Sequence, residues 1–595
     1  MVASLQAFIL TKYPTPFFSV GELGLATLAL GPLPSFVPLV LLLSVLMIHG
    51  QRIARRQTRG RELLCSWISV TAGSALAHWR PVTTALSSPT QSLTAVVLLS
   101  GATYSIVVVS IYLDILLKGR LNTNWARFTL FPALWATCWT ITPRISPVGR
   151  LLNWWPAPVP SPYTWMLPIV GPAGIDWIVA AWAVVCSELV AQWLMGFSEY
   201  EPLDTHNNQS LLSSRTKGLL SLVTILITLT FPSSVSQSLP SRSDVVAHTP
   251  LTVGCALPNP LDGSRPSLKD FIDETAKMNA AYVILWPESA VIFNSERERE
   301  DAFTRIRELT IPGFVGVAFD EYVVGDPAHT RNGFALIHKG QKSGDEVVQY
   351  YKRNLVPCEQ QSLPCSSCSS DNEKVTESFS KIPSVDPPVI TRWQMKNPKG
   401  ITKPDWAPAP NYTRPLLITS SICLDFTSPT VFTDLDARPS LILGPARTWD
   451  STVGLAMWEQ AKSRANELGT MVLWCDGGST GVSGVGGGGI QEPMQIGGGS
   501  WMRTISVRYP FDENRTLYAK GGDFSVIALL VALMGGGVAS NLLLTWSNRG
   551  AARMLAEGRT ALLRVPLMRR LISSSAANTD LLGAEEVGER QGLLG

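Results

Sequence analysis

Charged side chains are scarce in this sequence. Asp, Glu, Lys and Arg make up 16% of the 595 residues, whereas soluble domains carry roughly 25%. Together with 46% hydrophobic residues and a mean hydropathy of +0.16, this shortage excludes a disordered chain and a wholly soluble enzyme. The 49 basic and 46 acidic residues nearly cancel to a net charge of +3, which excludes a nucleic-acid partner that is recognised through a basic field.

Cysteine and histidine are also sparse. Nine cysteines are too few for a disulfide scaffold, and none of the six histidines falls at metal-ligand spacing. Cys365 and Cys368 have the spacing of half a zinc site, but no second pair follows, so a disulfide within this stretch or to Cys358 is expected instead. We expect no metal and no cofactor. The first residues lack a basic stretch followed by an apolar core, so no cleavable signal peptide is expected.

Long apolar runs, in contrast, are abundant. A membrane crossing needs roughly 20 apolar residues, and seven runs approach that length: 23–50, 63–79, 93–117, 128–142, 175–196, 218–231 and 524–546. The first contains Gly31-Pro32-Leu33-Pro34, and the sequence leaves open whether it crosses once or twice. We expect a polytopic α-helical membrane domain over 1–235, an α/β domain over 245–520, one C-terminal transmembrane helix over 524–546, and a basic, disordered cytoplasmic tail over 547–595.

The positions of arginine and lysine predict the orientation in the membrane. The strongest cytoplasmic signal is the loop 51–61, which contains five arginines. When the membrane crossings after this loop are counted, further basic residues also fall on the cytoplasmic side: Lys118, Arg120, Arg127, Arg215, Lys217 and the basic tail. The α/β domain then lies outside the cytosol, as the sequons at Asn411 and Asn514 would allow. Arg144 and Arg150 fall on the opposite side and contradict this count.

The segment 251–520 has the composition of a globular domain. Buried strands are expected at 251–257, 281–286, 313–319, 333–338, 346–352, 416–423, 441–443 and 471–475. Helices are expected after Ser267 and over 296–307 and 452–468. Residues 362–402 are polar and rich in proline and serine, which is typical of a surface insertion. A glycine-rich loop is expected from the last strand to Ser500. Alternating strands and helices indicate an α/β layered domain.

Three residues with reactive side chains lie where these strands end. Glu288 follows the strand 281–286, Lys352 ends the strand 346–352, and Cys423 ends the strand 416–423. A thiol beside a carboxylate and an ammonium is an activated nucleophile, because the carboxylate accepts the thiol proton and the cation stabilises thiolate and oxyanion. Taken singly, each residue is more simply explained: a lone cysteine at a strand end is usually a packed small hydrophobe, and a lone lysine is usually solvated.

In this order and context, the three residues resemble the Glu-Lys-Cys triad of the nitrilase (carbon–nitrogen hydrolase) superfamily. The whole chain more narrowly resembles the bacterial apolipoprotein N-acyltransferases. Trp286-Pro287-Glu288-Ser289-Ala290 matches the Trp-Pro-Glu-x-Ala of that family, and Lys352-Arg353-Asn354-Leu355-Val356-Pro357 matches its Lys-x-x-Leu-Val-Pro. The helix around Arg464-Ala465-Asn466-Glu467 is similar to the family's helix near the active site. The resemblance implies a four-layer αββα sandwich for the extracytoplasmic domain.

The resemblance also implies roles for individual residues. Glu288 would be the general base, Cys423 the nucleophile that takes the acyl group as a thioester, and Lys352 the oxyanion stabiliser. Glu359, offset by one residue from the family pattern, would take the place of a second essential Glu that positions Lys352 or the incoming amine. After the nucleophile the family has Cys-Tyr-Glu, whereas this chain has Cys423-Leu424-Asp425, so Asp425 would take the supporting position.

The implied reaction moves an acyl chain from a phospholipid to Cys423 and then to an amine, which in the bacterial family is the N-terminus of a lipoprotein. The implied partners are therefore a phospholipid acyl donor, an amine or lipoprotein-like acceptor and the lipid bilayer, without nucleic acid. Two alternatives stay open: a membrane-anchored amide hydrolase that passes the thioester to water, and a catalytically inactive membrane scaffold with the same fold.

Two other motifs compete with this interpretation. Gly477-Gly478-Ser479-Thr480-Gly481 fits the nucleophile elbow G-x-S-x-G, and Gly484, Gly486 and Gly489 fit the dinucleotide motif G-x-G-x-x-G. Both motifs must lead into a helix. The chain instead continues through a run of glycines, which disfavours a helix by roughly 1 kcal/mol per residue, so neither motif is expected to be functional.

Overall fold

The computed structural model describes residues 13–56, 59–83, 85, 88–157, 161–195, 214–234, 247–259, 265–323, 325–342, 348–356, 381–398, 401–487 and 490–536. Residues Met1–Val531 form one compact unit and Ala532–Gly595 a second. Three of the sequence-based expectations lie outside the described residues: the role of Glu359, the disulfide among Cys358, Cys365 and Cys368, and the tail 547–595.

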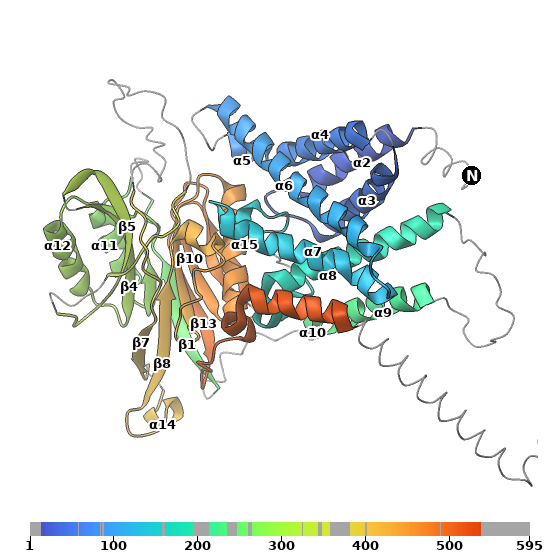
Figure 1. Cartoon of the computed structure of the whole chain (residues 1–595). Helices are drawn as coiled ribbons and strands as arrows, with labels where there is room; N and C mark the ends of the chain where they lie inside the picture. Colours follow the sequence, from blue (N-terminus) through green and yellow to red (C-terminus); the bar gives the residue numbers. More distant parts are fainter. Residues whose placement is uncertain are drawn as a thin grey trace, which may run out of the picture. The chain divides into compact units, whose positions relative to one another are not determined.

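The N-terminal part of the chain is helical (Figure 1). Its helices are α2 (Pro14–Ala29), α3 (Phe36–Arg55), α4 (Arg59–Ala77), α5 (Trp79–Thr83), α6 (Pro89–Lys118), α7 (Asn124–Ile145), α8 (Leu167–Met195), α9 (Ser214–Thr228) and α10 (Phe231–Ser234), with 3-10 turns η2 (Gly149–Leu152) and η3 (Thr164–Met166). The Gly-Pro-Leu-Pro interruption separates α2 from α3, so the first apolar run forms two helices. Proline fixes its own backbone and lacks an amide donor, which explains the break.

Within the described residues, five helices are long and apolar enough to cross a membrane: Phe36–Arg55, Pro89–Lys118, Thr164–Trp193, Arg215–Ser233 and Leu517–Gly536. Four of the predicted runs therefore correspond to one such helix each, and the run 23–50 contributes the first. The runs 63–79 and 128–142 form α4 and α7, helices of 19 and 22 residues. Helices α2, α3, α4, α6, α7, α8 and α9 share one apolar core, in which the ring of Trp135 makes T-shaped contacts with the rings of Trp139 and Trp154.

The segment 248–508 forms two mixed sheets. The first sheet has the order β13-β1-β2-β4-β5-β6, with β3 added beside β4, and the second has the order β12-β11-β10-β9-β8-β7. In each sheet three parallel strands lie at the centre, β1-β2-β4 and β8-β9-β10. The strands of the first sheet are β1 (His248–Cys255), β2 (Val283–Leu285), β3 (Val291–Phe293), β4 (Phe314–Val323), β5 (Asp326–His338), β6 (Val348–Tyr351) and β13 (Trp501–Arg508).

The second sheet consists of β7 (Thr391–Lys396), β8 (Thr413–Ser420), β9 (Leu441–Ala446), β10 (Met471–Asp476), β11 (Val482–Gly487) and β12 (Ile490–Ile496). One apolar core joins residues of both sheets, among them Leu251, Leu285, Leu443 and Leu473. A buried disulfide between Cys255 on β1 and Cys475 on β10 connects the two layers covalently. This pairing differs from the disulfide that was expected around Cys358, Cys365 and Cys368.

Helices cover the outer faces of both sheets and complete four layers, α, β, β and α (Figure 1). Phe271 on α11 (Leu268–Lys277) and Phe303 on α12 (Glu296–Arg307) pack on the first sheet. Ser267 caps α11 and forms a capping box with Asp270, as the sequence pattern predicts. On the second sheet lies α15 (Ser451–Leu468), whose Ala461 and Ala465 pack in an apolar core that is continuous with the one joining the sheets.

Three stretches fold differently from the expectation. The glycine-rich stretch before Ser500 forms the hairpin of β11 and β12 in place of a loop, because its glycines let neighbours approach: a Cβ on Gly486 would lie 2.4 Å from the Lys462 side chain of α15. Within the predicted insertion 362–402, residues 391–396 form the edge strand β7. Strand β13 was not predicted at all.

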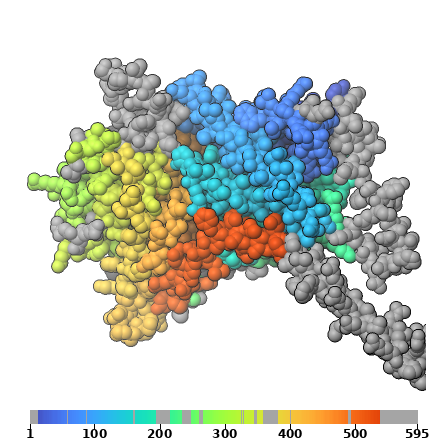
Figure 2. All heavy atoms as spheres, viewed as in Figure 1, coloured from blue at the N-terminus to red at the C-terminus, as the bar shows by residue number. Residues whose placement is uncertain are grey.

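Two glycines of the helical region with positive φ contact the sandwich and the last helix, Leu517–Gly536. A Cβ on Gly149 of η2 would lie 2.4 Å from the Thr427 carbonyl oxygen, and a Cβ on Gly171 of α8 would lie 2.2 Å from the Tyr518 ring. Both φ values are +56°, a conformation that glycine adopts readily. Arg144 at the end of α7 forms an ion pair with Asp523 of the last helix, N to O 3.1 Å. Figure 2 shows residues 517–531 of this helix, coloured orange-red, beside the blue and cyan helical region.

Candidate active site at the strand ends

The carboxylate of Glu288 lies where the two sheets meet at the carboxyl ends of their parallel strands. Glu288 follows β2, and its backbone amide donates to the carbonyl of Ala446 at the end of β9 (3.3 Å). The carboxylate oxygen Oε1 accepts from Lys352 Nζ at 2.6 Å and from Asn332 Nδ2 at 2.9 Å. Asn332 on β5 thus supports Glu288 in a way that sequence reasoning missed, since an isolated Asn within a strand carries no motif.

Lys352 completes a buried ion pair with Glu288. It follows β6, and its backbone amide donates to the Asn332 carbonyl at 2.9 Å, so β5 sets its position. The exposed fractions are 1% for Lys352 and 3% for Glu288. Charges are rarely removed from water to this degree without partners, and here each partner is the one that the sequence pattern predicts.

Cys423 is the first residue of the 3-10 turn η4 (Cys423–Thr427), which follows β8. The sequence predicts it at the end of a strand, but β8 ends at Ser420. Its thiol is not part of a disulfide and the residue is 6% exposed. Its φ of +44° is in the left-handed region, where a residue with a Cβ is strained, and such strain is typical of functional positions.

Asp425 connects the turn of Cys423 to the segment of Lys352. Its Oδ1 accepts from the Asn354 backbone amide at 2.7 Å and from Asn354 Nδ2 at 2.8 Å, while Oδ2 accepts from the Tyr350 hydroxyl at 2.8 Å. Burial raises the pKa of Asp425, and the charge of Lys352 partly opposes this rise. The residues on either side of Lys352 are therefore bound to the residue two positions after Cys423, which brings the two segments together.

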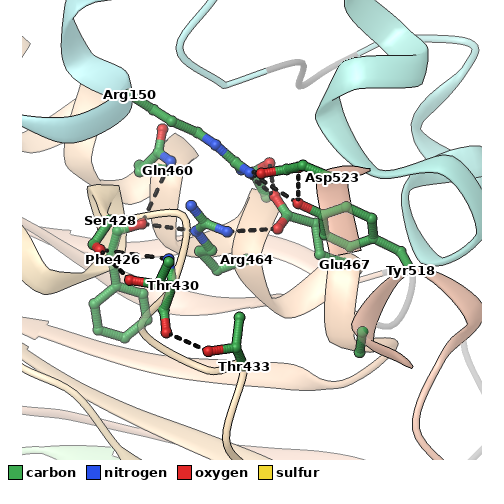
Figure 3. Close-up of polar contacts among 12 residues, drawn as sticks. Arg150, Phe426, Ser428, Thr430, Thr433, Gln460, Arg464, Glu467, Tyr518 and Asp523 are labelled. Carbon is green, nitrogen blue, oxygen red and sulfur yellow. Dashed lines mark hydrogen bonds and ion pairs between the residues drawn. The ribbon is translucent and has the colours of Figure 1, made fainter. Parts of the chain in front are cut away.

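Helix α15 holds the other end of η4 (Figure 3). Arg464 Nε donates to the Phe426 carbonyl oxygen at 2.9 Å, and Gln460 Nε2 donates to the same oxygen at 3.4 Å. Arg464 Nη1 also pairs with Glu467 Oε2 at 2.7 Å. This is the helix that the resemblance places near the active site, and here its arginine and glutamine fix the turn that begins with Cys423.

Glu467 continues this network into the helical region (Figure 3). Its Oε1 accepts from Arg150 Nη1 of η2 at 2.7 Å, and Arg150 Nη2 donates to the Tyr518 hydroxyl at 3.0 Å. Tyr518 in turn donates to Asp523 at 2.6 Å. Although burial alone would lower it, the surrounding charges, chiefly Glu467, raise the pKa of Arg150 overall. Three distant parts of the chain thus meet in one buried charge cluster.

The two competing glycine motifs begin after β10. After β10 the run 477–481 leads into strand β11 and not into a helix, so Ser479 has no nucleophile elbow. Asp476 at the end of β10 has a structural partner in Thr448, whose amide and hydroxyl donate to its two carboxylate oxygens at 2.9 and 2.7 Å. Gly489 of the dinucleotide motif lies outside the described residues.

No family model matches this chain, and no curated protein matches it. Among solved structures it is similar to a mutant of the Nesterenkonia AN1 amidase from the nitrilase superfamily, at 15% identity over 49% of this chain and 98% of that chain, with a TM-score of 0.31. It is also similar to Saccharomyces cerevisiae Nit3 of the nitrilase superfamily, at 16% identity over 44% and 91%, with a TM-score of 0.29.

Proposed function

We propose that this protein is a membrane N-acyltransferase that moves an acyl chain from a phospholipid through a thioester on Cys423 to an amine. The observation that carries this proposal is the buried Glu288–Lys352 pair at 2.6 Å, joined through Asp425 to the turn of Cys423, which forms no disulfide. A carboxylate, an ammonium and a thiol are the three groups that acyl transfer through a thioester needs.

The steps follow from the chemistry of the three groups. The Glu288 carboxylate takes the Cys423 proton, the thiolate attacks the ester carbonyl of the lipid, and the Lys352 ammonium stabilises the oxyanion. When the tetrahedral intermediate collapses, the ester C–O bond breaks and the leaving alkoxide takes the proton from Glu288. An amine then attacks the thioester and loses its proton to Glu288, and the departing thiolate recovers that proton.

A lipid donor accounts for the helices and for a cavity beside the sandwich. A diacyl lipid partitions into the bilayer with about 0.8 kcal/mol for each buried CH₂, so an enzyme that uses it must reach the membrane. A cavity of about 320 Å³ is lined by Trp449, Val453 and Met457 of the sandwich and by Leu30, Val82 and Leu151 of the helical region. Its lining is predominantly apolar, as an acyl chain requires.

We place the sandwich on the non-cytosolic side of the membrane. The arginine-rich loop 51–61 supports this orientation, and the disulfide between Cys255 and Cys475 suits an oxidising compartment. Arg144 and Arg150, which oppose the orientation in a simple count, are both engaged in ion pairs, with Asp523 and Glu467. Their positions therefore have a structural reason that is independent of membrane topology.

The test is intact-mass analysis of the full chain in detergent after incubation with a phospholipid whose sn-1 acyl chain is isotopically labelled. We expect one labelled acyl adduct on the wild type and none on Cys423→Ala. Addition of a peptide with a free N-terminus should discharge the adduct into an N-acyl peptide. Free fatty acid without acylated peptide would point to a hydrolase, and a wild type without any adduct would contradict the proposal.

A further inference from the structure

Two guanidinium groups converge on one backbone carbonyl beside the proposed base. Arg265 Nη2 donates to the Ser289 carbonyl oxygen at 2.7 Å, and Arg447 Nη1 lies 3.4 Å from the same oxygen. Ser289 directly follows Glu288 and has a φ of +51°, so its peptide is turned in a way that side chains rarely permit. Both arginines are exposed, and a ligand can therefore reach them.

Among the residues that the structure describes, these two cations have no carboxylate as an ion-pair partner. Neither arginine forms an ion pair with a carboxylate of the described ranges, since Glu288 pairs with Lys352, and Asp320 pairs with Lys381 at 2.9 Å. Partial desolvation, and next the repulsion by Arg265, lowers the pKa of Arg447. Like charges that are held together this closely are stabilised when an anion lies between them.

The same segment leads from this cationic pair into the apolar cavity. Arg447 is followed by Thr448, which Asp476 fixes, and by Trp449, which lines the cavity and donates from Nε1 to the Pro81 carbonyl at 3.4 Å. Val453 and Met457 of α15 continue the lining. Two cations at one end and an apolar cavity at the other match a ligand with an anionic head and a hydrocarbon tail.

We propose that Arg265 and Arg447 bind the phosphodiester of a glycerophospholipid and thereby select the acyl donor. Guanidinium groups suit phosphate oxygens because they donate paired N–H bonds in a planar fork. The bound headgroup places an acyl chain in the cavity lined by Trp449. This inference rests on the proposed function, because it identifies which part of the donor lies beside Glu288.

Binding measured without turnover tests the site. The full chain with Cys423→Ala is titrated by calorimetry with 1,2-dihexanoyl phosphatidylglycerol, with the neutral 1,2-dihexanoylglycerol and with inorganic phosphate. We expect the phosphatidylglycerol to bind more tightly than either. Adding Arg265→Gln and Arg447→Gln should weaken its binding by about ten- to a hundredfold, since bonds to charged groups are lost, and should leave the neutral lipid unchanged.

Matched variants separate recognition from folding. Arg447→Lys keeps a positive charge and should retain part of the affinity, whereas Arg305→Gln, which removes an exposed arginine from α12, should retain all of it. Unchanged phosphatidylglycerol affinity in the double variant would overturn the site, as would inorganic phosphate that binds equally well. Phosphate-dependent binding in a protein whose wild type forms no acyl adduct would keep the site and refute the acyltransferase.

Discussion

The two sheets of the sandwich contribute different chemistry to the candidate site. The first sheet carries the charges, with Glu288 after β2, Asn332 on β5 and Lys352 after β6. The second carries the proposed nucleophile, because Cys423 and Asp425 follow β8. Neither sheet alone has the three groups that acyl transfer needs, so the site exists only where the sheets pack together.

The surroundings of the two sheets differ as well. The outer face of the first sheet is covered by α11 and α12, which are adjacent in sequence to its strands. The outer face of the second sheet is covered by α15, and Glu467 of that helix pairs with Arg150 of the helical region. The difference teaches that the helix beside the proposed nucleophile is joined by an ion pair to the helical region, whereas α11 and α12 pack on the first sheet through apolar side chains.

The largest effect should come from the charged half. Glu288→Gln should slow acylation of Cys423 by about 10²- to 10⁴-fold, because the general base is lost. Lys352→Met should slow it to a similar degree and should also destabilise the fold, since it leaves the buried Glu288 without its cation. The rate of adduct formation and the thermal midpoint measure the two effects.

The double variant Glu288→Gln with Lys352→Met serves as the control for that experiment. It removes both charges, so it should recover most of the stability that Lys352→Met loses, while its acylation stays as slow. Acylation at the wild-type rate in any of the three variants would show that the first sheet does not supply the acid–base chemistry.

The next largest effect is expected when the disulfide between the two sheets is removed. Replacing Cys255 and Cys475 with alanine removes a disulfide with a sequence separation of 220 residues, and we expect a loss of about 2–5 kcal/mol in unfolding free energy. Denaturant titration of the full chain in detergent measures it. Cys186→Ala, which removes a free cysteine of α8, is the control, and equal stability of the two variants would argue against the disulfide.

A smaller effect is expected where α15 holds the nucleophile turn. Arg464→Met removes the bond to the Phe426 carbonyl, and acylation should fall about tenfold, the equivalent of about 1.4 kcal/mol for one lost bond at a charged group. Arg464→Lys should restore part of the rate. Lys462→Met is the matched control, because Lys462 is equally buried on α15 but pairs with Glu459. A similar loss in both would mean that α15 acts only through stability.

The smallest effect concerns the pH dependence of stability. Because burial raises the pKa of Asp425 in the folded chain, the folded state holds this proton more tightly than the unfolded state. The stabilisation that the protonated Asp425 carboxyl provides is therefore complete below a pH of about 4, and it declines as the pH rises through the raised pKa of the folded chain. In the variant Asp425→Asn, the part of the decline in stability with rising pH that comes from this carboxyl should vanish. Thermal midpoints between pH 4 and 8 test this, and an unchanged slope would contradict it.

Local sequence signals predicted the regular elements well. The Ser267 cap and the charged stretch at 296–307 each mark a helix that the structure contains, and the apolar runs at 251–257 and 471–475 correspond to β1 and β10. These signals succeed because hydrophobic periodicity and capping act over a few residues.

The local signals fail where the structure depends on packing between distant segments. The glycine-rich hairpin of β11 and β12 is stabilised by close approach to α15, as the Gly486 contact shows, and no local pattern encodes that contact. The pairing of Cys255 with Cys475 likewise depends on how the sheets stack. Within the site, Glu288, Lys352 and Cys423 were predicted from motif context, while Asn332, Arg150 and the convergence of Arg265 and Arg447 depend on long-range placement.

The most direct measurement is to map the acyl thioester to a single cysteine. The full chain is incubated with labelled phospholipid, digested, and analysed by tandem mass spectrometry with and without neutral hydroxylamine. The account predicts a hydroxylamine-sensitive acyl group on the peptide of Cys423 and none on Cys65, Cys138 or Cys186, the other cysteines of the described chain that form no disulfide. A thioester on one of those three, or none at all, would contradict it.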